Sequence, residues 1–237
     1  MNVLELNQHF SSFFNGLQFE EKEHIYHYDG RDLPSVSSFL NKVAEKVDFI
    51  QKAIHVANRE GVTQEEVLAR WKKINTEAID RGKQTHSFAE QDTHDNPELK
   101  QEEAVQKFFR QLNEQCNNRY LIVSKELQMV HKTLYYCGTS DLLIYDKHTN
   151  TFIIGDWKTN KDLFKNFKGK TLLEPFEYML DCPFSKYQIQ LCMYQMMFEQ
   201  LGYTVSERWI IWTQANGEPI KYDGYDCRQD IMTAFFN

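Results

Sequence analysis

Apolar and polar positions alternate in blocks near the middle of the chain, and this pattern predicts a β-hairpin. Two apolar runs, at residues 141–145 and 151–155, flank the polar stretch 146–150, as is typical of two strands joined by a turn. A turn centred between His148 and Thr149 fixes which residues of the two strands face each other. The pattern therefore predicts the hairpin together with its register.

This register brings acidic residues together at the open end of the hairpin. Asp141 would face Asp156, and the Cβ atoms of directly opposed residues lie about 4.5–5.5 Å apart. Side chains alternate along a strand, so Asp156 and Lys158 point to one face and Trp157 to the other. Two carboxylates this close repel each other unless they share a cation or a proton, and Mg²⁺ prefers such oxygen ligands. A surface hairpin with ordinary solvated charges is the alternative.

Periodicity and chain breakers predict the remaining elements. A short hairpin is expected around residues 28–31, and a capping box of Thr63 and Glu66 opens a long helix. We expect helices at 36–44, 48–60, 64–92, from Asn96-Pro97 to about 116, and at 185–201, with strands near 119–131, 134–146, 151–158 and 206–213. The core order is helix, strand, strand, strand, helix, strand, which indicates an α/β (α+β) fold.

The chain has 237 residues, 41% of them hydrophobic, and can bury a full core as one domain. Within a single domain over 1–237 we expect a mainly helical extension over 1–75, a catalytic core over about 76–213 and a C-terminal appendage over 214–237. No internal repeat and no low-complexity linker marks a second domain.

Five motifs, in chain order, resemble the motifs of one nuclease family. Gly138-Thr-Ser-Asp141 and Asp156-Trp-Lys158 look like the signature acids and lysine of the PD-(D/E)XK nuclease superfamily. Arg81-Gly-Lys-Gln-Thr-His86 is similar to the Arg-Gly-x-x-x-His helix of its RecB-like exonuclease branch, to which mitochondrial genome maintenance exonucleases and phage relatives belong. Tyr187-Gln-Ile-Gln190-Leu-Cys-Met-Tyr194 resembles the Gln-x-x-x-Tyr helix of the same branch, and Leu33-Pro-Ser-Val resembles its Pro-Ser-Val-Thr opening.

The resemblance implies a restriction-endonuclease-like αβββαβ core that hydrolyses DNA with Mg²⁺ or Mn²⁺. It implies that the metal is bound by His86, Asp141, Asp156 and the backbone carbonyl of Trp157. Lys158 is expected to orient the attacking water and to stabilise charge in the transition state, because neighbouring carboxylates favour its protonated form. Its expected role is electrostatic rather than that of a general base.

Several further motif residues are open to two interpretations. Gln190 is an expected active-site contact, whereas Tyr194, on the same helix face, belongs either to the site or to the core. Glu90 lies one turn after His86 and is either a partner of the metal ligands or a surface charge. Glu126, just before the hairpin, matches a carboxylate often present in this branch and is a candidate for the same role.

The formal net charge of −7 argues against indiscriminate nucleic-acid binding, because Lys and Arg supply most nonspecific affinity for phosphate. Contacts with DNA must then be local. The stretch 158–170 combines five lysines and two phenylalanines with a single acid, and such aromatic residues stack on unpaired bases. The candidate DNA contacts are Arg81, Lys161, Phe164, Lys165, Phe167 and Lys168. A solvated loop anchored by its phenylalanines is the alternative.

Cysteine usage and hydropathy indicate the compartment. The five cysteines are widely spaced and form no Cys-x-x-Cys pair, so we expect free, mostly buried thiols. Some relatives carry an iron–sulfur cluster, but this chain lacks the C-terminal cysteine group, and no cluster is expected. No apolar run approaches the roughly 20 residues that cross a bilayer, and no signal or transit peptide is recognisable. We expect an intracellular, cytoplasmic protein of a bacterium or a phage-infected host.

The expected activity is that of a metal-dependent DNA exonuclease acting in recombination, repair or replication. A structure-specific or restriction-type endonuclease on the same core is the first alternative. The second is an inactive nuclease-fold module that binds DNA and recruits other proteins. Expected partners are DNA, as single strands or duplex ends, and a recombinase, a helicase or a single-strand-binding protein.

Overall fold

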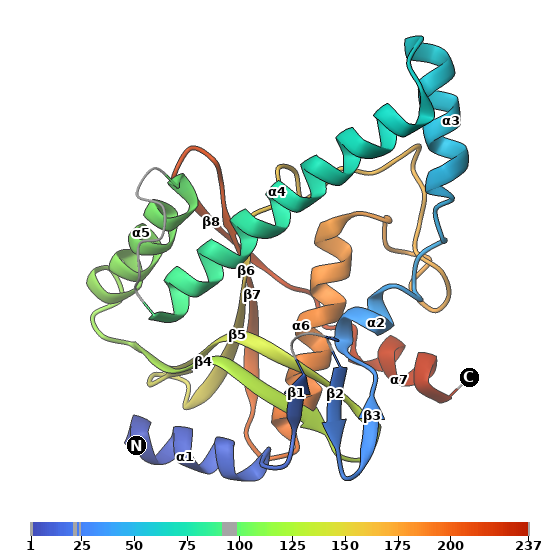
Figure 1. Ribbon diagram of the computed structural model, residues 1–237. Helices are drawn as coiled ribbons and strands as arrows, with labels where there is room; N and C mark the ends of the chain where they lie inside the picture. The colour runs from blue at the N-terminus through green and yellow to red at the C-terminus, as the bar shows by residue number, and fades with distance from the viewer. Residues whose placement is uncertain (1, 21–22, 24, 92–98, 237) are drawn as a thin grey trace.

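A five-stranded mixed sheet forms the centre of the molecule (Figure 1). The computed structural model describes residues 2–20, 23, 25–91 and 99–236. The strands, in their order across the sheet, are β4 (Tyr120–His131), β5 (Tyr136–Asp146), β6 (Thr151–Lys158), β7 (Val205–Thr213) and β8 (Pro219–Asp223). Strands β6 and β7 are parallel, and the other neighbours are antiparallel.

Helices cover both faces of this sheet, which explains why β5 and β6 are apolar on both sides. The helices are α1 (Val3–Phe13), α2 (Val36–Leu40), α3 (Phe49–Glu60), α4 (Gln64–Gln91), α5 (Lys100–Glu114), α6 (Pro183–Glu199) and α7 (Arg228–Phe236). Helices α4 and α5 pack on one face through Phe88 and Phe108, which join a cluster with Trp157 and Trp209. Helices α6 and α1 bury the other face, where Phe10 and Phe198 pack on Phe152.

The predicted core order is confirmed: helix α5 is followed by β4, β5 and β6, then α6, then β7. The predicted hairpin register is also confirmed, since Leu143 pairs with Ile154 and Tyr145 with Phe152. These pairs follow from the apolar side chains that both strands must direct to the same face. The mixed α/β fold class is therefore the one that the sequence indicates.

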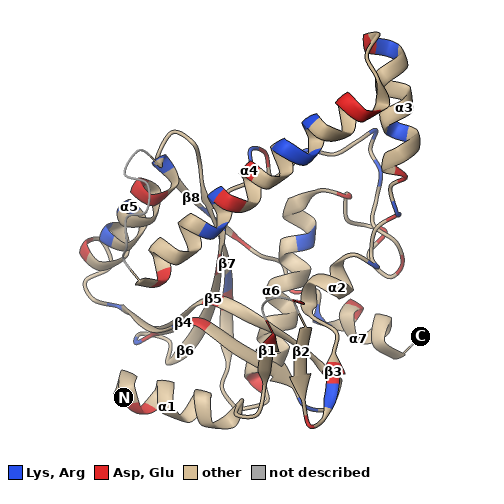
Figure 2. Ribbon diagram, viewed as in Figure 1, with Lys and Arg blue, Asp and Glu red and all other residues tan. Residues whose placement is uncertain are grey.

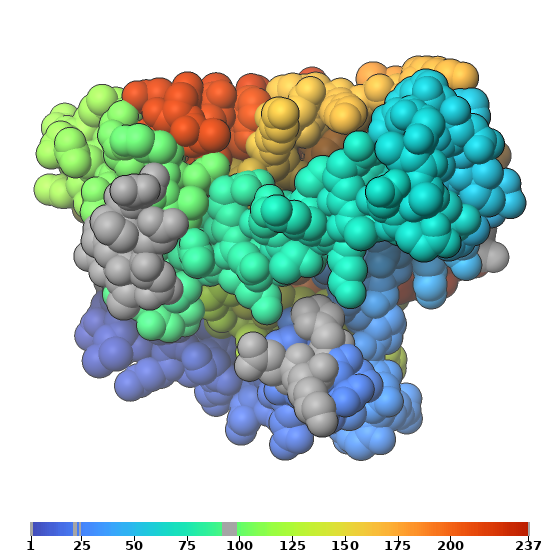
Figure 3. All heavy atoms as spheres, turned by 45° about the horizontal axis from the view of Figure 1, so that its top comes forward, coloured from blue at the N-terminus to red at the C-terminus, as the bar shows by residue number. Residues whose placement is uncertain are grey.

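A second, three-stranded sheet packs beside α2, and its strands are β1 (Gln18–Glu20), β2 (Ile25–Tyr28) and β3 (Arg31–Leu33). The first 75 residues thus contain a sheet as well as helices. Helix α3 and the first half of α4 form an arm that projects from the body (Figure 1). The loop between β6 and α6 reaches the base of this arm (Figure 3), where Leu173 N–H donates to the carbonyl of Val43.

The capping box that opens α4 is present, because Thr63 N–H donates to Glu66 and Glu66 N–H donates to the Thr63 hydroxyl. Helix α2 ends at Leu40, four residues before the expected boundary. The predicted helix start at Asn96-Pro97 lies outside the described residues, and α5 is described from Lys100.

Four elements at the ends of the chain were not predicted, namely α1, β1, β8 and α7. A signal for α1 is present in the sequence, because Asn2 caps the helix and Leu6 and Phe10 lie one turn apart on its buried face. The expectation of free cysteines is confirmed, and all except Cys116 are buried. Among the described helices, none is both long enough and apolar enough to cross a membrane.

Candidate functional site

Three carboxylates lie in a row across neighbouring strands β4, β5 and β6. The strand pairs on either side of Glu126 place it opposite Asp141. One residue beyond the pair of Leu142 and Gly155, the same ladder places Asp141 opposite Asp156. Glu126, Asp141 and Asp156 form what we call the carboxylate row.

Glu126 occupies this row with a left-handed backbone, at φ 49°. A non-glycine residue in this region is strained by about 1–3 kcal/mol, and such strain inside a strand is unusual. The register of β4 also shifts by one residue between Ile122 and Ser124, which sets Glu126 opposite Asp141. The sequence named Glu126 as a candidate, but it gave no signal of this bulge.

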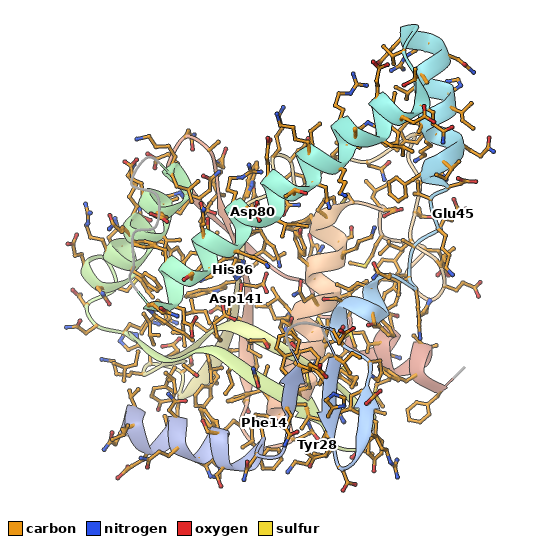
Figure 4. All side chains as sticks on the ribbon, viewed as in Figure 1. Phe14, Tyr28, Glu45, Asp80, His86 and Asp141 are labelled. Atoms are coloured by element: carbon orange, nitrogen blue, oxygen red, sulfur yellow. The ribbon has the colours of Figure 1, made fainter. Side chains whose placement is uncertain are left out.

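Helix α4 carries His86 to the row, where it points toward Asp141 (Figure 4). His86 Nδ1 lies 3.4 Å from Asp141 Oδ2 and 3.6 Å from Glu126 Oε1. The ligand atoms of these three residues all lie within 4.8 Å of one another. Burial favours the neutral imidazole, but the charge of Asp141 and the proximity of Glu126 outweigh it and raise the pKa of His86 well above its ordinary value.

Asp156 is almost fully buried, with 1% of its surface exposed. Burial, followed by repulsion from Asp141, raises its pKa to about 7, although Lys158 opposes the shift. The Lys158 ammonium contacts Asp156 Oδ2, yet this atom accepts no hydrogen bond of ordinary geometry. Gln190 Nε2 lies 3.4 Å from Asp156 Oδ1. Asp156 is thus a buried carboxylate whose charge the protein only partly compensates.

Lys158 is held over an aromatic ring. Burial disfavours its charge, but Asp156, Tyr187 and Asp141 together raise its pKa above the usual range. Its Nζ lies 4.2 Å from the centroid of the Tyr187 ring, within the range of cation–π contacts. The Tyr187 hydroxyl donates to Asn160 Oδ1 at 2.7 Å, so the ring is fixed at its far end.

Tyr187 received no role from the sequence, although a signal was present. It lies three residues before Gln190 and seven before Tyr194, so the three residues share one face of α6. Gln190 Nε2 donates to the Tyr194 hydroxyl at 2.9 Å. A Cβ on Gly138 would lie 2.8 Å from the Tyr194 ring, so glycine at this position leaves room for the tyrosine.

The donor set of the row fits a hard divalent cation. Asp141 Oδ2 accepts a hydrogen bond from Trp157 N–H at 2.7 Å, which fixes the carboxylate. The charge of His86 lowers the Asp141 pKa against the effect of burial. Carboxylate oxygens with one imidazole are suited to Mg²⁺ or Mn²⁺, and a cation would relieve the repulsion at Asp156 Oδ2.

The other candidates lie around the row rather than in it. Glu90 is exposed on α4, and its backbone carbonyl accepts from Lys125 Nζ at 3.3 Å. Arg81, on α4, and Lys161, just after β6, line a common pocket. Figure 2 shows cationic and acidic residues interspersed along α4.

The two phenylalanines of the loop between β6 and α6 differ in their surroundings. Phe164 is 47% exposed, but it packs in an aromatic cluster, with its ring centroid 4.9 Å from that of Phe184 and 5.4 Å from that of Tyr222. Phe167 is 59% exposed, and the ammonium groups of Lys52 and Lys168 lie 5.5 and 5.4 Å from its ring centroid. Phe164 therefore anchors the loop, while Phe167 presents an open ring among cations.

Comparisons with known proteins give one solved structure to report. No protein-family model matches the chain, and no curated protein matches it. Among the solved structures that match is a provisionally named exonuclease from Eubacterium rectale, 19% identical, with a TM-score of 0.45. The match covers 67% of this chain and 63% of that one, less than two thirds of its length.

Proposed function

We propose that this protein is a metal-dependent DNA exonuclease that hydrolyses phosphodiester bonds at the carboxylate row. The observation that carries the proposal is the alignment of Glu126, Asp141 and Asp156 across three strands, with His86 above them and Lys158 beside them. The motifs that resemble RecB-like exonucleases supply these residues except Glu126, which matches a carboxylate often present in that branch.

The residues proposed to hold Mg²⁺ or Mn²⁺ are His86, Asp141, Asp156 and the carbonyl of Trp157, with Glu126 as a further donor. Such an ion, when bound, polarises a phosphate oxygen and promotes ionisation of water. Hydrolysis forms a bond between the water oxygen and phosphorus and breaks the bond to the ester oxygen, which takes up a proton as the alcohol.

The protein contributes to the proposed reaction a fixed positive charge and side chains that orient the site. Lys158, protonated and fixed by Asp156 and Tyr187, stabilises the negative charge that develops on the phosphate in the transition state. Gln190 orients Asp156 through its amide. Arg81 and the lysines of the loop between β6 and α6 are the proposed contacts to DNA phosphates.

The test is a time course with end-labelled linear single-stranded and duplex DNA beside a closed circle. Wild type and Asp156→Asn are compared in Mg²⁺, Mn²⁺ or EDTA. Metal-dependent loss of linear DNA with the circle spared, absent in the variant, is the expected result. Cleavage of the circle would indicate an endonuclease, and no cleavage in any condition would leave a DNA-binding module.

The loop contact has its own test. Replacing Lys165 and Lys168 by glutamate should weaken DNA binding and reduce its dependence on salt, because each lost phosphate contact lowers the number of released counterions by about one. Lys147→Glu, at the exposed turn of the β5–β6 hairpin, is the matched control. If the salt dependence of DNA binding is unchanged in the double variant, the loop is a solvated loop that does not contact DNA phosphates.

A further inference from the structure

A pocket of about 600 Å³ opens beside the carboxylate row, where β6 ends. Strand β6 carries Asp156 and Lys158, and the chain continues directly into Thr159 and Asn160 in the pocket wall. Arg81, five residues before His86 on α4, lines the other side. Ligand pockets in proteins typically measure about 300–1,000 Å³, so the space suits one nucleotide.

The pocket gathers positive charge in an acidic protein. Arg81, Lys100 and Lys161 line it, and none of its described lining residues is acidic. Lys100 pairs with Glu103 at 3.0 Å, whereas Arg81 and Lys161 form no ion pair within the described part of the chain. In a protein with a net charge of −7, these two cations give the pocket a local positive charge that suits an anionic ligand.

The pocket also gathers carboxamides. Four of its lining residues are Gln101, Asn160, Gln214 and Asn216. Gln101 is 5% exposed, and the side-chain amides of Gln101 and Gln214 form no hydrogen bond with another described residue. Amide groups at a pocket wall that have no protein partner are available to hydrogen-bond a ligand.

The remaining wall is aromatic. Trp212 is partly buried, and its indole N–H donates to the Asn160 carbonyl at 2.7 Å. This bond fixes the ring beside the amides. An indole face stacks on nucleic-acid bases, while Asn and Gln recognise base edges through paired hydrogen bonds.

We propose that this pocket binds one unpaired nucleotide of the strand to be cleaved, next to the phosphate held at the carboxylate row. This inference rests on the proposed nuclease function. Arg81 and Lys161 hold its phosphate, and Gln101 and Gln214 form hydrogen bonds with the Watson–Crick edge of its base. In a duplex that edge is engaged by the partner base, so the pocket admits single-stranded or frayed DNA.

The test measures binding without turnover, in EDTA, by fluorescence anisotropy. The probes are a fluorescein-labelled 12-nucleotide DNA strand and an abasic strand of the same length, which keeps the phosphates and lacks the bases. Gln214→Leu is the main variant, and Gln111→Leu, at an exposed position of α5, is its matched control. Lys161→Ala reports on the phosphate contact.

We expect Gln214→Leu to bind the base-bearing strand about tenfold more weakly and the abasic strand unchanged, because only a base edge engages the amide. Lys161→Ala should weaken both probes by the same factor, and Gln111→Leu should change neither. Equal effects of Gln214→Leu on both probes, no effect on either, or failure of the wild type to bind either probe would overturn the proposal.

Cleavage assays on the same proteins separate this proposal from the proposed function. If Gln214→Leu loses affinity only for the base-bearing strand but wild type cleaves no DNA with Mg²⁺ or Mn²⁺, the pocket proposal stands and the nuclease function fails. If wild type cleaves DNA but Gln214→Leu binds the base-bearing and the abasic strand with equally changed affinity, the pocket proposal fails and the nuclease function stands. Unchanged melting temperatures would exclude misfolding as the cause.

Discussion

Two buried aspartates of the β5–β6 hairpin, Asp146 and Asp156, have opposite surroundings. Asp146 closes the turn end of β5 with none of its surface exposed, and Asp156 lies at the open end of β6 with 1% exposed. Arg119 donates to both oxygens of Asp146, at 2.8 and 2.5 Å, and His148 N–H donates at 2.9 Å. Asp156 instead faces Asp141, and its Oδ2 contacts the Lys158 ammonium without accepting a hydrogen bond of ordinary geometry.

The acidities of the two groups differ accordingly. Hydrogen bonding to Arg119 lowers the pKa of Asp146 to about 2. Burial and the charge of Asp141 raise the pKa of Asp156 to about 7. A carboxylate whose hydrogen bonds are complete stabilises the fold, whereas a buried carboxylate that is repelled by its neighbour is a candidate for a functional site. The two ends of one hairpin thus hold a structural aspartate and a candidate functional aspartate.

Of the substitutions considered, Asp156→Asn should have the largest effect on activity without a loss of stability. Asp156→Asn should lower the cleavage rate about 10³-fold or more, since it removes charge where the transition state is stabilised. Its melting temperature in EDTA at pH 8 should equal or exceed that of wild type, because repulsion from Asp141 is removed. Single-turnover cleavage and calorimetry measure both effects, and wild-type rates in Asp156→Asn would contradict the metal site.

The residues around Asp156 should respond to metal, and those around Asp146 should not. His86→Ala should weaken the activation by Mg²⁺ at least about tenfold, with partial recovery in Mn²⁺, because the imidazole is a softer ligand than oxygen. Titration of the cleavage rate with each metal measures the change. Arg119→Gln, the control beside Asp146, should leave the metal dependence as in wild type.

Asp146→Asn, at the turn end of the hairpin, should lower stability without changing activity. Asp146→Asn leaves Arg119 without its carboxylate and should lower the free energy of unfolding by about 2 kcal/mol. Below its melting temperature the variant should cleave DNA at the wild-type rate. Urea unfolding measures the loss, and a variant as stable as wild type would show that the Arg119 pair contributes little.

Asp156 and Asp146 should contribute to the pH dependence of stability with opposite signs. The pKa of Asp156 is raised from 3.8 to about 7 in the folded state, so its contribution is complete below pH 3.8 and is lost as the pH rises through 7. The pKa of Asp146 is lowered to about 2, so its contribution is lost as the pH falls toward that value. In EDTA, wild type should lose about 2–3 kcal/mol more than Asp156→Asn between pH 5 and pH 8.

Melting temperatures over this pH range measure the difference. The pKa of His86 is also raised, by Asp141 and Glu126 and to a smaller extent by Asp156. Most of its contribution is therefore common to both proteins, and the difference between them reports chiefly on Asp156. Parallel curves for wild type and Asp156→Asn would contradict the raised pKa.

The sequence predicted the β5–β6 hairpin well because its register is set locally. The alternation of apolar residues around Leu143 and Ile154 allows only one pairing that buries both strands. The capping box at Thr63 is likewise a contact between near neighbours. The motifs predict His86, Asp141 and Asp156 as site residues, and the fold brings them close together.

The remainder depends on contacts that join distant parts of the chain. The position of Glu126 follows from a bulge in β4, and that of Tyr187 from the packing of α6 against β6. The pocket at Trp212 combines residues of α4, α5 and the ends of β6 and β7. Sequence periodicity reports which face of an element is buried, but not which elements meet there.

The left-handed backbone of Glu126 also bears on how this protein could be engineered. Glycine adopts that conformation without the strain of about 1–3 kcal/mol that a glutamate incurs. A thermostability screen that ignores activity would therefore favour Glu126→Gly and would remove one carboxylate from the row. Position 126 is where selection for heat resistance and selection for turnover would choose different amino acids.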